Sequence, residues 1–345
     1  MKILYISRKY DYGDPKRGFN FNHYNFYDSL VKINNREHQV IYFPFDEIML
    51  EKDQEAMNKM LVERVAQEKP DLCFFCISGN EIKKETIKEI SKKTVTFNWF
   101  WDDHWRFDNY SKYWASCFNW IATTDSLAIN KYYKIGYKNV IKTQWACNHF
   151  LYKPLNLEKI YDLTFIGQPH GKRKKIIKKI KKAGLKINCW GKGWPRGRIS
   201  QEEMIKIFSQ SKINLNFSNS SIRPPLKAIG GIFLGRHWIS NLRSFINRRR
   251  RKQIKGRNFE IPGCKGFLIT DSADNLEDYY QDGKEIVIYK DVDDLIDKIK
   301  YYLTCPEERE RIAEAGYQRT LKDHTYEKRF QKIFKTIGLY NSVNL

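Results

Sequence analysis

The chain has 345 residues, of which 41% are hydrophobic and 15% aromatic, so it is long enough for two ordinary domains and too apolar to be disordered. No stretch approaches the ~18 consecutive apolar residues of a membrane span, and Arg8 and Lys9 interrupt the N-terminal run too early for a secretory signal. The formal net charge is +22, and residues 161–260 alone hold 25 Lys and Arg against four acidic residues, a net +21. This concentration indicates an anionic ligand rather than a general solubility bias.

The first half of the chain alternates strands and helices. Strand-like runs occupy residues 2–7, 39–45, 72–78, 94–100, 120–124 and 140–146, with helical patterns around 21–33, 55–67, 82–92 and 126–135 between them. Short strands separated by helices form right-handed βαβ units with a parallel sheet. Residues 1–153 are therefore predicted to form a doubly wound, Rossmann-like domain.

The alternation restarts after Tyr152-Lys153-Pro154. Strands are predicted at 162–166, 185–190, 213–217, 267–270 and 286–289, and helices at 172–182, 200–210, 293–303, 306–322 and 326–337. Residues 154–323 are thus predicted to form a second α/β domain of the same kind, followed by a C-terminal segment at 324–345. The part from about 220 to 255, with its run Arg248–Lys252, is predicted to be a basic insertion.

Seven cysteines lie scattered in apolar context. An odd, dispersed set indicates a reducing cytoplasm rather than a disulfide framework. The close pair Cys73 and Cys76 falls in a predicted strand, where positions i and i+3 face opposite sides, so a shared metal is not expected.

A strand, a glycine-bounded turn and a cationic helix follow one another from Thr164 to Lys175. The turn carries Gly167 and His170, and the helix begins with Lys172 and Arg173. Free N–H groups at a helix start, the helix dipole and these cations all favour a phosphate. The pattern lacks a complete G-x-G-x-x-G and is equally typical of a basic solvated helix after a turn.

A second block, residues 255–271, holds Glu260 on a short helix that leads into a buried strand. A fixed carboxylate can accept hydrogen bonds from both hydroxyls of a ribose. The neighbouring cations Lys255 and Arg257 could neutralise a diphosphate.

The run from Gly256 to Thr270 resembles the group 1 glycosyltransferases, and more closely their spore-maturation-protein-like (CgeB-like) branch. Further matching blocks are Asn275–Glu285, Arg311–Gly316 and His324–Phe330. With the stretch around Phe165–Arg173, the resemblance covers about residues 160–330.

The resemblance implies a GT-B fold, in which two doubly wound Rossmann-like domains face a central cleft and the second domain holds a nucleotide-sugar donor. It implies that the last helix crosses back to the first domain and that Glu260 holds the donor ribose. The family motif has another glutamate eight residues earlier, where this chain has Lys252. The donor-binding candidates are Gly167, His170, Lys172, Arg173, Arg257, Asn258, Glu260 and Glu277.

The first half offers Trp101-Asp102-Asp103-His104 directly after a predicted strand, within a cluster of tryptophans. Asp103 or His104 could act as the general base toward an acceptor hydroxyl, and in a retaining enzyme His104 could instead contact the donor sugar. A carboxylate in such a loop can equally cap a helix, and the tryptophan rings can equally belong to the core. Asp102-Asp103 is not a D-x-D motif, and cations can stabilise a leaving diphosphate, so no metal and no further cofactor are expected.

The sequence thus predicts a cytoplasmic or peripherally membrane-bound glycosyltransferase that moves a sugar from a nucleoside-diphosphate sugar to a hydroxyl of a glycan, lipid or protein-linked acceptor. The run Arg248–Lys252 could contact an anionic membrane at its inner face, or be a solvated loop. A nucleic-acid partner is disfavoured because no recognition motif accompanies the basic segment. A non-catalytic sugar- or nucleic-acid-binding relative and a nucleotide-sugar epimerase remain as alternatives.

Overall fold

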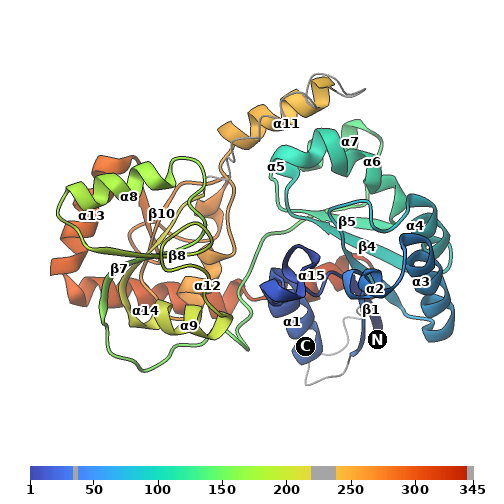
Figure 1. The fold of residues 1–345 in the computed structure, drawn as a ribbon, viewed down its shortest axis with the longest axis horizontal. Coiled ribbons are helices and arrows are strands. Elements are labelled where there is room, and N and C mark those ends of the chain that lie inside the picture. The colour runs from blue at the N-terminus through green and yellow to red at the C-terminus, as the bar shows by residue number, and fades with distance from the viewer. Residues whose placement is uncertain (34–37, 219–237, 340–345) are drawn as a thin grey trace. The chain divides into compact units, whose positions relative to one another are not determined.

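The computed structural model describes residues 1–33, 38–218 and 238–339, without the side chains of 248–250. The chain divides into two compact units (Figure 1): Met1–Gln144 together with the segment from Tyr326 onward, and Trp145–Thr325. The sequence placed these boundaries at 153 and 323. Residues just after Gln144 belong to the second unit because Cys147 N donates to His324 O at 2.8 Å and Cys147 forms a parallel bridge with Thr325.

The first unit is built on a six-stranded parallel sheet of order β2-β1-β3-β4-β5-β6. Its strands are β1 (Lys2–Ser7), β2 (Gln39–Pro44), β3 (Leu72–Cys76), β4 (Val95–Phe100), β5 (Trp120–Thr123) and β6 (Val140–Lys142). The α-helices are α1 (Asp28–Lys32), α2 (Phe45–Glu51), α3 (Gln54–Glu68), α4 (Lys84–Ser91), α5 (Asp103–Arg106), α6 (Lys112–Trp114), α7 (Ala128–Lys134) and α15 (Tyr326–Thr336).

Alternation along the strands gives this sheet two apolar faces. On β3, Phe75 joins the core under α3 and α4, whose contributions include Leu61 and Ile87. Phe74 faces the opposite side, where its ring lies 5.6 Å from that of Phe330 on α15. The C-terminal helix therefore completes the core of the first unit.

The second unit is built on a five-stranded parallel sheet of order β11-β10-β9-β7-β8. Its strands are β7 (Tyr161–Ile166), β8 (Ile187–Trp190), β9 (Ser211–Asn216), β10 (Leu268–Asp271) and β11 (Val287–Tyr289). Its helices are α8 (Arg173–Lys182), α9 (Gln201–Gln210), α11 (Trp238–Arg250), α12 (Arg257–Gly263), α13 (Val292–Thr304) and α14 (Pro306–Asp323). Figure 1 shows α8 and α13 on one face of this sheet and α9 and α14 on the other.

Both sheets confirm the predicted α/β class, and the strand bounds agree with the apolar runs to within about two residues, except that the strand predicted at 140–146 ends at Lys142. The helix predicted at 200–210 is capped by Ser200, whose Oγ accepts from Glu203 N at 3.1 Å at the start of α9. No helix of the described residues is both long and apolar enough to cross a bilayer. Of the predicted insertion, residues 220–237 lie outside the described part, and 238–250 form α11.

Candidate active site

The strand order of the second unit marks a ligand-binding edge. The chain passes from β7 outward to β8 and then returns across β7 to β9. The loops after β7 and β9 therefore leave the sheet in opposite directions, and ligands of doubly wound folds bind at this switch point, outside the carboxyl ends of the strands. The loop after β7 is the predicted phosphate turn, and the loop after β9 begins at Phe217 and Ser218.

The turn at Gly167 is locked against the loop after β8. Gly167 N donates to Trp190 O at 2.8 Å, and Gly167 O accepts from Trp194 Nε1 at 2.7 Å. Gly191 allows this approach, because it has φ +131° and a Cβ there would lie 2.5 Å from Gly167 O. Both groups of the Gly167 peptide are thus engaged, so the turn supports the site rather than presenting a free amide at this residue.

Arg173 joins the two loops across the switch point. Its Nη1 donates to Gln168 O at 2.9 Å and its Nη2 donates to Phe217 O at 2.6 Å. Burial lowers the pKa of Arg173 to about 10, an effect that the charge of Asp271 partly offsets. The guanidinium stays protonated at neutral pH and holds the loops after β7 and β9 together through these two hydrogen bonds.

The predicted neighbours of Arg173 lie nearer the surface. Lys172 is exposed at the N-terminal end of α8, beside the free N–H groups of the first turn. His170 is half-buried, and its carbonyl accepts from Arg173 N at 3.1 Å. Lys172 is therefore the residue of this loop that an incoming anion can reach directly.

A polar cluster lies at the carboxyl end of β10. Asp271, whose side chain is 5% exposed, accepts from Ser218 N at 2.7 Å through Oδ1, and its Oδ2 lies 3.3 Å from Lys252 Nζ. Burial and then the charge of Asp271 raise the pKa of Tyr289, the last residue of β11. Lys252, at the position of the absent family glutamate, thus places a half-exposed ammonium at this edge.

Asn258 ties α12 to the same edge. Its Oδ1 accepts from Asn216 Nδ2 at 2.9 Å and from Lys255 N at 3.0 Å, and its Nδ2 donates to Thr270 Oγ1 at 3.3 Å. Asn216 and Thr270 belong to β9 and β10, so this amide holds the start of α12 over the strand ends.

Glu260 is fully buried and pairs with Arg257 across one turn of α12. Arg257 Nη1 donates to Glu260 Oε2 at 2.6 Å. Burial alone would lower the pKa of Arg257, but Glu260 and Tyr152 outweigh it and the pKa is raised. Glu260 Oε1 and Arg257 Nε are buried and have no hydrogen-bond partner among the described residues. The other predicted carboxylate, Glu277, is exposed on the short helical turn Leu276–Asp278.

The two candidates of the first unit are both buried at the carboxyl end of β4. Asp103 Oδ2 accepts from the Tyr132 hydroxyl at 2.8 Å. Burial raises the pKa of Asp103 to about 6; the hydroxyls of Ser111, Thr123 and Tyr132 lower it, and the charge of Asp125 raises it slightly. Asp103 therefore links α5 to α7 through this hydrogen bond.

His104 lies beside an acid, Asp125, that the sequence analysis did not place at the site. A ring nitrogen of His104 lies within 4.8 Å of a carboxylate oxygen of Asp125, which follows β5. Asp125 Oδ1 also accepts from Leu127 N at 3.0 Å, which fixes the turn before α7 rather than capping the helix itself. This neighbour can hold the imidazole in one orientation.

Sequence reasoning missed several of these partners, namely Asn216, Ser218, Asp271, Asp125, Tyr132 and Trp194. Asn216 and Asp271 end buried strands, so a polar residue at the carboxyl end of each predicted strand was the available signal. Trp194 and Tyr132 carried no such signal, because their indole and hydroxyl groups bond to residues distant in sequence.

Comparisons with known proteins agree with this architecture. Residues 172–335 match the family described as "Glycosyl transferase-like". Spore protein CgeB of Bacillus subtilis is 26% identical over 216 residues, which make up 60% of this chain and 64% of that protein. The chain thus aligns with slightly under two thirds of its curated relative.

Solved structures share the fold. Sucrose-phosphate synthase from Thermosynechococcus elongatus superposes with a TM-score of 0.61 at 10% identity, covering 98% of this chain and 99% of that one. Anabaena HepE, in complex with UDP and glucose, gives a TM-score of 0.58 at 11% identity, covering 99% and 100%. At such identities the likeness shows the fold, which is that of GT-B glycosyltransferases.

The family match covers slightly under half of the chain and the curated relative is 26% identical, so these comparisons show a similarity to glycosyltransferases and to CgeB, while the solved structures show the GT-B fold. They agree with the resemblance seen in the sequence.

Proposed function

We propose that this protein transfers a sugar from a nucleoside-diphosphate sugar to a hydroxyl of a glycan, lipid or protein-linked acceptor, and that the second unit holds the donor. The observation that carries the proposal is the cationic edge at the β7/β9 switch point, where Lys172 and the α8 N-terminus lie on one loop and Lys252 lies by Asp271. The neighbour HepE was solved with UDP-glucose, which supports a nucleotide-sugar donor.

The diphosphate is the best-supported part of this ligand. As the glycosidic bond breaks, negative charge develops on the departing diphosphate, and preorganised cations and helix N–H groups stabilise it. Lys172 and Lys252 supply ammonium groups, while Arg173 holds the loop after β7 against Phe217 at the end of β9. These groups can act without a metal ion, so we propose a metal-independent reaction.

Glu260 is the proposed ribose contact through Oε1, the carboxylate oxygen that Arg257 leaves unpaired. Because the side chain is fully buried, this contact requires the residues that cover α12 to move when the donor binds. His104 is the proposed group of the first unit that contacts the acceptor hydroxyl or the donor sugar, with Asp125 orienting its ring and Asp103 positioning α5.

Donor turnover tests the proposal. The full chain is incubated with UDP-, GDP-, dTDP- and ADP-sugars, and release of the nucleoside diphosphate is followed with and without glycan or lipid acceptors. We expect one nucleotide class to be consumed, and Lys172→Gln to slow its release by roughly tenfold to a hundredfold, as for one lost donor to a developing charge. Lys300→Gln, an exposed lysine of α13, is the matched control.

Two outcomes would overturn the proposal. Conversion of the donor sugar to its epimer, with no transfer to any acceptor, would indicate an epimerase. Nucleotide binding without turnover of any donor would indicate a non-catalytic relative.

A further inference from the structure

The solvent face of α8 is composed of lysine. The apolar residues Ile176, Ile177 and Ile180 are buried against the sheet. Apart from the buried Arg173, the remaining positions from the residue before the helix to its end are exposed lysines, at 172, 174, 175, 178, 179, 181 and 182. A helix of ten residues is about 15 Å long, so these ammonium groups form a dense, flat surface.

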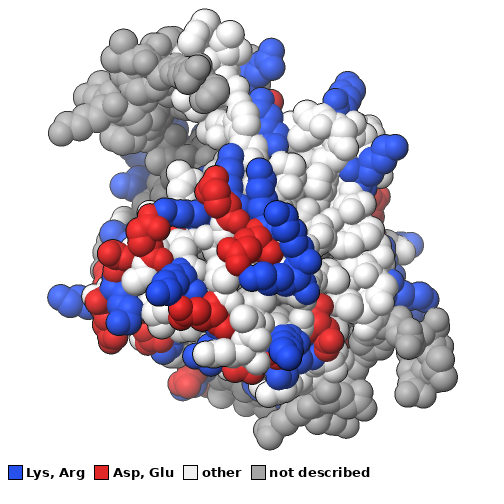
Figure 2. Space-filling view, turned by 90° about the vertical axis from the view of Figure 1, so that its right-hand side faces the viewer, with Lys and Arg blue, Asp and Glu red and all other residues white. Residues whose placement is uncertain are grey.

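Carboxylates hardly neutralise this surface. Among the described residues, one of these lysines has an ion-pair partner: Lys179 Nζ lies 3.9 Å from a carboxylate oxygen of Asp293 on α13. Three lysines of the first unit differ from them: Lys59 on α3, and Lys83 and Lys93 on either side of α4, each lie within ion-pair distance of a glutamate. Figure 2, which views the side where α3 and α4 lie, shows acidic and basic side chains interleaved.

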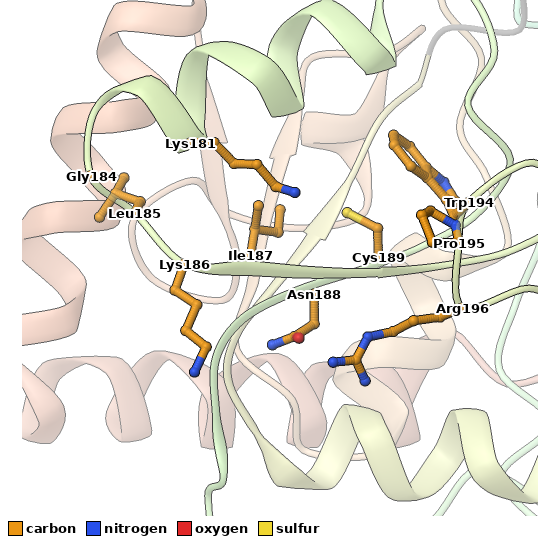
Figure 3. Close-up of a pocket in the computed structure, with 10 residues that line it drawn as sticks. All are labelled: Lys181, Gly184, Leu185, Lys186, Ile187, Asn188, Cys189, Trp194, Pro195 and Arg196. Atoms are coloured by element: carbon orange, nitrogen blue, oxygen red, sulfur yellow. The ribbon is translucent and has the colours of Figure 1, made fainter.

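The cationic surface continues into a groove along the edge strand β8. This cavity of about 510 Å³ is lined by Lys181, Lys186 and Arg196, together with Asn188 and Trp194. Figure 3 shows Lys181 from α8 and Arg196 from the loop after β8 extending alongside the strand, with Lys186 turned outward. The Arg196 guanidinium lies 5.2 Å from the Trp190 ring centroid, which holds this cation at the groove.

We propose that the lysine face of α8, with the adjoining groove, docks this protein on an anionic phospholipid bilayer. A dense row of long, flexible cations with few acidic partners complements the negative potential of such a surface. Single-stranded nucleic acid would call for exposed aromatic rings among the cations. Of the tryptophans at this groove, Trp194 is half-buried and donates its indole N–H to Gly167 O, and Trp190 is buried.

This assignment differs from the one that the sequence suggested. In the sequence, the run Arg248–Lys252 could equally contact a membrane or be a solvated loop. In the structure, Lys252 Nζ lies 3.3 Å from Asp271 Oδ2, and the side chains of 248–250 lie outside the described part. The proposal concerns docking alone and does not depend on the donor site.

Co-sedimentation of the full chain with vesicles tests the proposal. The wild type should bind vesicles of phosphatidylcholine with phosphatidylglycerol, should not bind pure phosphatidylcholine, and should be released by salt. Each lysine near an anionic surface contributes roughly fivefold to partitioning. Lys174→Gln with Lys175→Gln and Lys178→Gln should therefore weaken binding on the order of a hundredfold.

The matched control replaces Lys59, Lys83 and Lys93 with Gln, an equal change of charge where the lysines are ion-paired, and should leave binding within about twofold. If the triple α8 variant unfolds, the single variants Lys174→Gln and Lys178→Gln should each weaken binding about fivefold. Unchanged binding of a folded α8 variant would overturn the proposal. Tighter binding to single-stranded RNA or an acidic polysaccharide than to the vesicles would overturn it as well.

Discussion

Arg257 and Glu260 form a buried ion pair, and we expect the loss of Arg257 to lower the free energy of unfolding more than the loss of Glu260. Removing one member of a buried ion pair costs about 3–5 kcal/mol, because the other charge is left buried. The Glu260 side chain is 0% exposed, whereas the Arg257 side chain retains 27% exposure. Arg257→Met strands a carboxylate that water cannot reach and should cost about 5 kcal/mol. Glu260→Gln strands a cation that water reaches in part and should cost about 3 kcal/mol or less.

Urea unfolding of the full chain, followed by tryptophan fluorescence, measures both variants. The double variant Arg257→Met with Glu260→Leu removes both charges, so its loss should be well below the sum of the two single losses. Additive losses, or a cost below about 1 kcal/mol for Arg257→Met, would refute the buried-pair account. The result also decides how Glu260 is tested as a ribose ligand. Glu260→Gln is the usable variant, because Glu260→Ala would confound lost binding with lost stability.

Two further predictions concern residues that hold the sites in place. The pKa of Asp103 in the folded protein is about 6, above its ordinary value of 3.8. The folding stability that protonated Asp103 contributes is therefore fully present below pH 3.8 and is lost as the pH rises through about 6. Relative to wild type, Asp103→Asn should therefore gain about 3 kcal/mol between about pH 4 and pH 8 in urea titrations; a pH-independent difference would contradict the raised pKa. Gly191→Ala should cost about 2 kcal/mol or more, since its Cβ would meet Gly167 O at φ +131°, and a Tm equal to wild type would show that the two loops do not approach so closely.

The sequence was sufficient for the fold because most of the strands are short, buried runs between helices, although β2 is largely half-buried. Strands of parallel sheets are apolar on both faces, so β1, β3 and β9 stand out from their surroundings. The segment from Asp103 to Cys117 was not predicted as helical. It consists of short α, π and 3-10 pieces, which are too brief to produce a helical period.

The location of the site could be predicted from the sequence, but most of the contacts between its residues could not. The cationic loop before α8 and the block around Glu260 both proved to lie by the carboxyl edge of the second sheet. The roles of Arg173 and Lys252 depend on partners far along the chain, Phe217 O and Asp271, which local spacing does not reveal. Glu260 was expected to face a ligand, and its pairing with Arg257 shows that a helix i,i+3 neighbour can occupy the carboxylate first.

Calorimetric titration of the full chain with UDP, GDP, dTDP and ADP tests the central claim most directly. The account predicts that one of these nucleoside diphosphates binds, that its affinity falls with added salt, and that Lys172→Gln weakens it at least about tenfold while Lys300→Gln does not. Absence of binding by every nucleoside diphosphate, or equal binding by wild type and Lys172→Gln, would contradict a donor site at the switch point of the second sheet.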